Sequence, residues 1–253
     1  MVRPCPKESW WAILAHVSTR RYFPKKPHPG RVPEQQPGNP LQPEHFRRVD
    51  QSDDAHFYAE PRLVTHIDDA AIDALTQFYR EALPPGGAIL DLMSSWVSHL
   101  PPDVDYARVE GLGMNAAELE RNPRLTGRTV HDLNRDPVLP YADDTFDAAL
   151  ICVSIQYLVR PVEVFTDAAR VLKPGAPLIV SFSNRCFPTK AIAAWQMLDD
   201  RGHGELVGLY FRLADAFEPA QAFPLVPPGG PSDPLYVAMA RTRPGNSTGI
   251  TPA

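Results

Sequence analysis

One acid and two hydroxyl side chains directly follow an apolar run in the stretch AILDLMSSWVSHLP, residues 88–101. Asp91 ends a predicted buried strand, and Ser94 and Ser95 stand where many nucleotide-binding folds have a glycine-rich turn. Carboxylates accept hydrogen bonds, and hydroxyls both donate and accept them. The spacing favours a loop whose own side chains contact a polar ligand. Plain loop serines, and Asp91 as the cap of a following helix, are the alternatives.

Further groups capable of chemistry follow other predicted elements or precede the first helix. They are Tyr58, His66, Asp68, His99, Gln156, Tyr157, Asn184 and Arg185. An imidazole titrates near neutral pH, so His66 is a candidate general base, with a surface position beside a helix cap as its alternative. An arginine fork pairs with paired oxygens, so Arg185 favours a negatively charged or carbonyl-bearing ligand. A surface salt bridge from Arg185 to Asp199 or Asp200 is the competing interpretation.

The elements that position these side chains follow from hydrophobic spacing. Residues 68–83 place Ala71, Leu75 and Phe78 on one helical face, and Thr65 or Asp68 can cap the start. Helices are also predicted over 161–172, 189–200 and 205–217, and strands over 88–92, 107–112, 128–131, 146–153, 176–182, 220–226 and 235–241. This order predicts a doubly wound, seven-stranded, mostly parallel α/β sheet with an antiparallel C-terminal hairpin. Ligands bind beyond the carboxyl ends of such strands.

Composition limits the domain count and the partners. The 253 residues are 43% hydrophobic and carry a net charge of -5, which favours one domain and gives no global basic field for nucleic acid. The early apolar run over 10–17 is too short to span a bilayer, so we expect no membrane partner. Cys5, Cys152 and Cys186 match neither zinc nor disulfide spacing, which favours the cytoplasm and no metal. The oligomeric state is left open.

Proline, glycine and polar residues mark both ends of the chain. We predict a Pro-rich, flexible N-terminal extension over 1–45, a folded domain over 46–242 and a disordered tail over 243–253. The basic residues within 1–26 also fit an organelle transit segment, which is the less favoured interpretation.

Four ordered segments resemble the motifs of the class I S-adenosylmethionine-dependent methyltransferases, particularly their small-molecule group. AILDLMS stands where that family has a strand leading into Asp-x-Gly-x-Gly, and VEGLGMN where a strand ends in Gly-hydrophobic-Asp. HDLNRDPVLPYADDTFD resembles the third motif, and RVLKPGAPLIVSFSN the helix that ends in Leu-Lys-Pro-Gly before the fifth strand. The resemblance covers nearly all of residues 60–242. It implies a Rossmann-like fold, S-adenosyl-L-methionine as cofactor and S-adenosyl-L-homocysteine as product.

The chain departs from this family at the cofactor loop. Met93 and Ser95 replace glycines, and Gly113 aligns with the acid that holds the ribose hydroxyls. Ser94, Ser95 and Asn115 are the candidates to substitute for that acid. The segments DLMSSWVSHLP, GLGMN and FSNRCFPTKAI resemble an uncharacterised bacterial and plant subgroup, which implies an alternative pocket kept by a lineage.

The resemblance also implies roles for individual residues. Expected cofactor contacts are Asp91, Met93, Ser94, Ser95, Gly111, Gly113, Met114, Asn115, Asp132, Leu133, Asn134 and Val153. Asp132 with Leu133 matches the position that reads adenine. Expected catalytic residues are His66, Tyr157 and Gln156, and expected acceptor-binding residues are Tyr58, Asp68, Asn184 and Arg185.

Two functions from different classes are consistent with this pattern. The first is methyl transfer to a small-molecule acceptor by direct displacement, where a base is needed only if the acceptor must lose a proton. The second is a methyltransferase-like binding or partner subunit without catalysis. A dehydrogenase fits poorly because the Gly-x-Gly-x-x-Gly turn is absent from the sequence.

Overall fold

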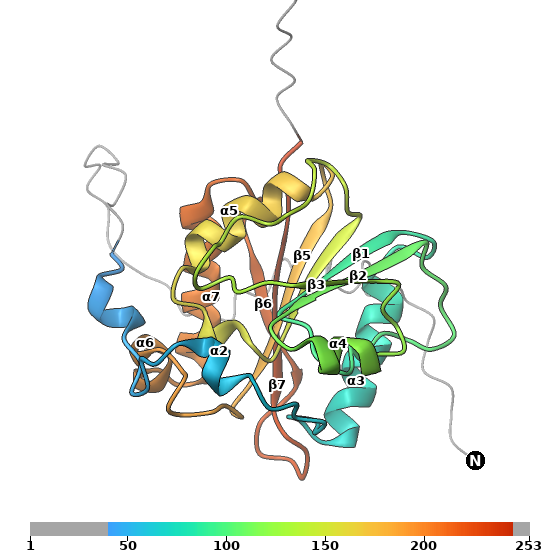
Figure 1. The fold of residues 1–253 in the computed structure, drawn as a ribbon. Helices are drawn as coiled ribbons and strands as arrows, with labels where there is room; N and C mark the ends of the chain where they lie inside the picture. Colours follow the sequence, from blue (N-terminus) through green and yellow to red (C-terminus); the bar gives the residue numbers. More distant parts are fainter. Residues whose placement is uncertain (1–39, 245–253) are drawn as a thin grey trace, which may run out of the picture. The chain divides into compact units, whose positions relative to one another are not determined.

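The alternating strands and helices form one seven-stranded sheet in the computed structural model, which describes residues 40–244 (Figure 1). The strands are β1 (Ala88–Leu92), β2 (Arg108–Gly113), β3 (Gly127–Val130), β4 (Ala148–Cys152), β5 (Pro177–Ser183), β6 (Gln221–Val226) and β7 (Leu235–Arg241). Their order is β3-β2-β1-β4-β5-β7-β6, and β7 runs antiparallel to both β5 and β6. The predicted fold class is therefore confirmed. The strand order reverses at β1: β2 and β3 lie on one side of it and β4 and β5 on the other, and β1 pairs with both β2 and β4.

Helices cover both faces of the sheet (Figure 1). The helical elements are η1 (Pro43–Phe46), α2 (Asp54–Phe57), α3 (Asp69–Ala82), α4 (Ala116–Arg121), η2 (Ile155–Tyr157), α5 (Pro161–Val171), α6 (Ala193–Met197) and α7 (Asp200–Ala214). α5 and α7 pack on one core cluster, and α3 packs on the other. β5 is buried along its whole length, as expected for a strand covered on both faces.

Several predicted boundaries differ from the structure for identifiable reasons. α7 begins at Asp200, not at 205, because Asp199 caps it by accepting a hydrogen bond from the backbone of Gly202. The predicted helix over 189–200 is shorter in the structure, where α6 spans Ala193–Met197. α4, which the sequence did not suggest, starts at a cap formed by Asn115. The predicted cap of α3 at Asp68 is confirmed by its 2.9 Å hydrogen bond from Ala71.

Buried ion pairs fix the segment before α3 to the domain. The Lys190 ammonium is fully buried and lies 3.0 Å from the Asp54 carboxylate and 3.1 Å from that of Asp50. Asp54 also pairs with Arg48 and accepts a hydrogen bond from Asn134. Leu41, near the end of the predicted extension, and Phe46, the first residue of the predicted folded domain, pack against the core. The remainder of that extension, and most of the predicted tail, lie outside the described residues.

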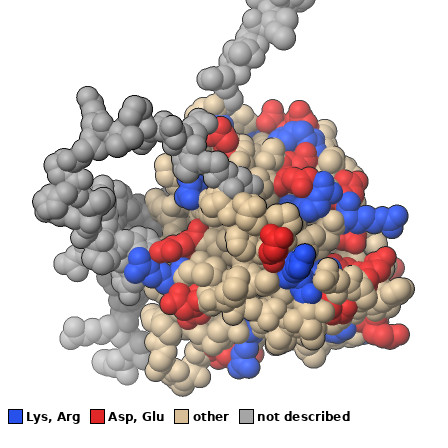
Figure 2. Space-filling model, turned by 90° about the vertical axis from the view of Figure 1, so that its left-hand side faces the viewer, with Lys and Arg blue, Asp and Glu red and all other residues tan. Residues whose placement is uncertain are grey.

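The surface shows mixed charge. In Figure 2, acidic and basic side chains lie interspersed on the described part of the face, and no continuous basic surface forms there. Across residues 40–244, no helix combines the length and the hydrophobicity that crossing a membrane requires.

The end of β2 is crossed closely by the loop that follows β1. The backbone N–H of Ser94 donates to the carbonyl of Leu112, and a Cβ on Gly113 would overlap the carbonyl oxygen of Ser94. Backbone cannot move aside as a flexible side chain can. The structure thus explains why no acid occupies position 113.

We predict that Gly113→Ala destabilises the protein by about 3 kcal/mol, because the new methyl group forces this loop away from β2. Gly208→Ala is the matched control, since a Cβ there meets nothing within 4 Å. It should stabilise α7 by up to about 1 kcal/mol. Urea unfolding measures both variants, and wild-type stability for Gly113→Ala would contradict the close crossing.

Candidate active site

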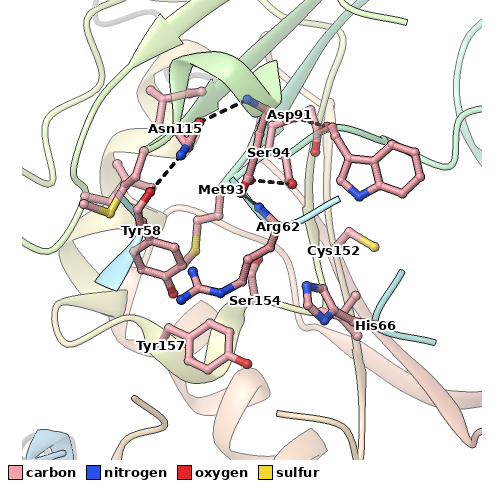
Figure 3. A pocket seen from close by; sticks show the side chains of 18 of the residues that line it. Tyr58, Arg62, His66, Asp91, Met93, Ser94, Asn115, Cys152, Ser154 and Tyr157 are labelled. Carbon is pink, nitrogen blue, oxygen red and sulfur yellow. Dashed lines mark hydrogen bonds between the residues drawn. The ribbon is translucent and has the colours of Figure 1, made fainter. Parts of the chain in front are cut away.

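One cavity lies at the carboxyl ends of β1, β2 and β4, where a doubly wound sheet binds its ligands. The expected cofactor contacts that line it are Asp91, Met93, Ser94, Ser95, Gly113, Met114, Asn115, Asp132, Leu133, Asn134 and Val153. The segment between α2 and α3 closes one side through Tyr58, Arg62 and His66 (Figure 3). Sequence positions far apart are therefore gathered around one space.

Three non-glycine residues that line this cavity have left-handed backbones. Met93, His99 and Val153 have φ angles of 56°, 51° and 43°. This conformation is costly for residues with a Cβ, most of all for β-branched valine, and such strain concentrates at functional sites. Met93 stands at the first glycine of the family motif.

Asp91 organises the loop after β1. Its carboxylate is buried and accepts hydrogen bonds from the hydroxyls of Ser94 at 2.7 Å and Ser98 at 2.6 Å. Asn122 donates both to the Ser98 hydroxyl and to the carbonyl of Ser95. Burial raises the pKa of Asp91 to about 6, while the two serine hydrogen bonds oppose the rise. The serines therefore position the acid as much as they offer groups to a ligand.

Side chains on α4 hold the segment that closes the cavity. Glu118 is buried and accepts hydrogen bonds from the Ser95 hydroxyl and from the backbone N–H of Arg62, both at 2.7 Å. Asn115 donates to the carbonyls of Tyr58 and Ala59. These bonds tie the closing segment to the loop after β1, so Asn115 and Glu118 serve the shape of the cavity.

Three polar groups in the cavity lack protein partners within residues 40–244. The hydroxyl of Ser154 and Nη1 of Arg62 are buried without a hydrogen bond. The carboxylate of Asp132 uses Oδ1 for the backbone of Asn134 and Arg135, and leaves Oδ2 without a partner among those residues. Buried polar atoms are normally satisfied. These groups fit a polar ligand that supplies the missing partners.

A second cavity adjoins the first. Thr65, His66, Tyr157 and Phe187 line both, and Ile67, Asp68, Arg185, Cys186 and Asp233 complete the second. Phe187 lies at the junction, with ring centroids 5.3 Å from His66 and 5.9 Å from Tyr157. Tyr157 and Arg185 therefore line this second cavity together with His66 and Asp68.

The pKa values of the side chains at this junction are shifted toward their uncharged forms. Burial lowers the pKa of His66 below its ordinary value, and nearby Arg62 adds to the effect. Burial lowers the pKa of His99 to about 4 and raises that of Tyr157 to about 12. At neutral pH, both imidazoles are therefore neutral and able to accept a proton.

Several predicted site residues have other roles. Gly111 lines neither cavity because the Leu125 side chain covers it, and Asn184 also lies outside both cavities. The buried Gln156 donates to the carbonyls of Val153 and Arg185, so it holds the turn after β4 and lines neither cavity.

Asp68 and Arg185 line the second cavity but are already engaged. The Asp68 carboxylate accepts hydrogen bonds from Ala71, Ser232 and Asp233. Arg185 pairs with Asp233 at 2.8 Å. The expected alternative of a salt bridge was correct in kind, but its partner is neither Asp199 nor Asp200. Asn134 likewise lines the first cavity with its amide bonded to Asp54, Tyr157 and Val159.

Sequence reasoning missed Glu118, Arg62 and Ser154. An Asn-x-x-Glu spacing from Asn115 to Glu118 is typical of a helix start and could have indicated α4. Arg62 was one basic residue in the expected closing segment. Nothing in the local pattern marks Ser154, because its isolation depends on which atoms surround it.

Comparison with known proteins agrees with this fold. Residues 100–180 match a family described as the methyltransferase domain. A 42-residue segment of the chain is 48% identical to a ubiquinone/menaquinone biosynthesis C-methyltransferase of Roseobacter denitrificans. It covers 17% of each chain. The methyltransferase phqN of Penicillium fellutanum is 37% identical over 76 residues, which is 28% of this chain and 23% of that one.

These curated relatives are matched over less than a quarter of their own length. Among solved structures, the [4+2]-cyclase SpnF aligns over 68% of this chain and 82% of its own, with a TM-score of 0.52 and 18% identity. That likeness shows a shared fold.

We predict that Asp91→Asn stabilises the protein at pH 7.5 by about 2 to 3 kcal/mol, since asparagine accepts both serine hydrogen bonds without a buried charge. The pKa of Asp91 is raised from 3.8 to about 6. The wild-type carboxyl is thus fully favourable below pH 3.8 and loses stability as pH rises through 6. The advantage of the variant should therefore vanish near pH 3.8.

Urea unfolding at both pH values measures this difference. The exposed Asp73→Asn on α3 is the control and should change stability by less than about 0.5 kcal/mol. A pH-independent difference for Asp91→Asn would contradict the assigned shift.

Proposed function

We propose that this chain is a class I S-adenosylmethionine-dependent methyltransferase and that it methylates a small-molecule acceptor; its fold and the matched segment support this assignment. S-adenosyl-L-methionine would be the methyl donor, and S-adenosyl-L-homocysteine the product. The name of one curated relative supports a small-molecule acceptor, because it describes a C-methyltransferase of ubiquinone/menaquinone biosynthesis.

The cavity at the ends of β1, β2 and β4 carries this proposal. It collects every expected cofactor contact except Gly111. Its acidic lining of Asp91, Glu118 and Asp132 complements a ligand with an ammonium and a sulfonium, and the unpartnered Ser154 and Asp132 atoms offer polar contacts. The residues present therefore fit the donor. Gly113 leaves the ribose without an acid at the family position.

The donor would supply a methyl group on a sulfonium centre. An acceptor atom would form a bond to the methyl carbon as the carbon–sulfur bond breaks, and S-adenosyl-L-homocysteine would be the leaving group. Asp132 Oδ2 would accept a hydrogen bond from the adenine amino group, and Ser154 would contact a polar group of the donor. Tyr157 and Phe187 line both cavities, so they would orient the acceptor and exclude water. The pKa of Tyr157 is raised to about 12, so its hydroxyl stays neutral in this role.

His66 is the group that we assign to proton removal. It lies in both cavities, and its lowered pKa keeps the imidazole neutral at pH 7, with a ring nitrogen able to take a proton from the acceptor. Gln156, which we expected to help, is confined to the turn after β4.

A binding or partner subunit without catalysis is the alternative function. The engaged Asn115 and Asn134 amides and the absent ribose acid favour a weaker cofactor site. Donor binding with no transfer to any acceptor would support this alternative.

Donor binding is the first test. We predict that calorimetric titration detects both S-adenosylmethionine and S-adenosylhomocysteine, and that Asp132→Ala weakens binding by about 1 to 3 kcal/mol through loss of a buried hydrogen bond. Asp136→Ala is the control, because Asp136 lies outside both cavities. No binding to the wild-type protein would refute the proposed function. Unchanged affinity in Asp132→Ala would place adenine elsewhere.

Turnover is the second test. We predict that His66→Ala lowers kcat by about 100- to 10,000-fold with little change in donor affinity. Because the pKa of His66 is lowered, wild-type kcat/KM should be flat from pH 7 to 8 and fall only below pH 6.5 as the imidazole gains a proton. His56→Ala, outside both cavities, is the control. Full turnover in His66→Ala would leave a proximity mechanism without a base at this position.

A further inference from the structure

Arg62 is a cation in the first cavity without a carboxylate partner. Its guanidinium forms no hydrogen bond or ion pair with any residue in 40–244, and its Nη1 is buried. By contrast, Arg48 is paired with Asp54, and Arg185 with Asp233. Charged groups taken out of water are normally paired, because desolvation is costly. The isolation of Arg62 therefore points to a partner outside the chain.

Neighbouring groups hold Arg62 in place. The guanidinium carbon lies 4.3 Å from the ring centroid of Phe57, 5.5 Å from that of Phe187 and 5.9 Å from that of Tyr58. Its backbone N–H is fixed by Glu118. Figure 3 shows the side chain extending toward Tyr58. A fork restrained by rings loses little freedom on binding, and its planar donors match the two oxygens of a carboxylate.

Acids near Arg62 are already engaged. Asp54 serves Arg48 and Lys190, and Glu118 serves Ser95 and the backbone of Arg62. Neither carboxylate forms an ion pair with the Arg62 guanidinium. A ligand carboxylate is the partner that the site lacks.

The ring contacts indicate which ligand brings that carboxylate. Phe187 packs against Arg62 and also lines the second cavity, together with His66 and Tyr157. The guanidinium, which lines the first cavity, thus lies beside a ring that the two cavities share. Phe187 and Tyr157, which line both cavities, offer flat apolar surfaces there.

We propose that Arg62 binds the carboxylate of an acceptor whose planar, apolar body packs against these rings. The inference rests on the proposed function and narrows its substrate to an organic acid. It also transfers to Arg62 the anion-binding role that the sequence suggested for Arg185.

Matched pairs of acids and amides test this inference. The full chain, saturated with S-adenosylhomocysteine, is titrated with benzoate, cinnamate and indole-3-acetate and with the amide of each. We expect at least one acid to bind the wild type more tightly than its amide. Arg62→Met should weaken binding of that acid by about 10- to 100-fold and leave its amide unchanged. Arg62→Lys should keep part of the preference, because it keeps the charge.

Arg80→Met is the control, because Arg80 lies outside both cavities and pairs with the exposed Asp103. It should keep the full preference for the acid. Affinity for S-adenosylhomocysteine should stay within about twofold of the wild-type value in all three variants.

Three results would overturn the inference while leaving the proposed function intact. The first is an equal affinity for acid and amide across the panel. The second is loss of the preference in Arg185→Met but not in Arg62→Met. The third is an Arg62→Met protein that binds S-adenosylhomocysteine weakly but 5′-methylthioadenosine normally, since the latter lacks the carboxylate and Arg62 would then bind the donor. Failure of the wild type to bind S-adenosylhomocysteine would instead refute the proposed function.

Discussion

The buried carboxylate of Asp91 is the interaction on which the site depends. It collects the hydroxyls of Ser94 and Ser98, and Asn122 extends the network to the carbonyl of Ser95. The Ser95 hydroxyl donates a hydrogen bond to Glu118, and Glu118 also accepts one from the backbone N–H of Arg62 in the segment that closes the cavity. A glycine motif lets backbone turn freely and approach a ligand. Here, side-chain hydrogen bonds to Asp91 hold the loop in which Met93 has a φ angle of 56°.

Hydrophobic spacing was sufficient to predict the fold but not the direction of polar side chains. The strand over 88–92 and the cap at Asp68 were predicted correctly, because strand burial and capping are local properties. Gln156 and Asn134 stood at plausible positions beyond strands, yet both amides satisfy backbone groups of neighbouring turns. Arg62 was overlooked although Arg185 was chosen, because only the packed structure shows which arginine has an acid beside it.

The close crossing at Gly113 accounts for the largest departure from the family pattern. An acid at this position needs a Cβ, and the carbonyl of Ser94 occupies that space. The missing acid after β2 therefore follows from the backbone path of the loop after β1. Asn115 is not free to substitute, since its amide holds the carbonyls of Tyr58 and Ala59.

Two buried groups of the cavity, Asp91 and His99, change the stability of the protein with pH in opposite directions. The pKa of Asp91 is raised to about 6, so its burial costs stability as pH rises from 3.8 through 6. The pKa of His99 is lowered to about 4, so its burial costs stability as pH falls from 6.5 through 4. Between about pH 4 and pH 6 the two effects oppose each other, so the stability of the protein changes less with pH than it would with either group alone. At neutral pH only the charge on Asp91 remains costly. A ligand with a positive group near that carboxylate would recover part of the cost, which ties the stability of the site to its occupation.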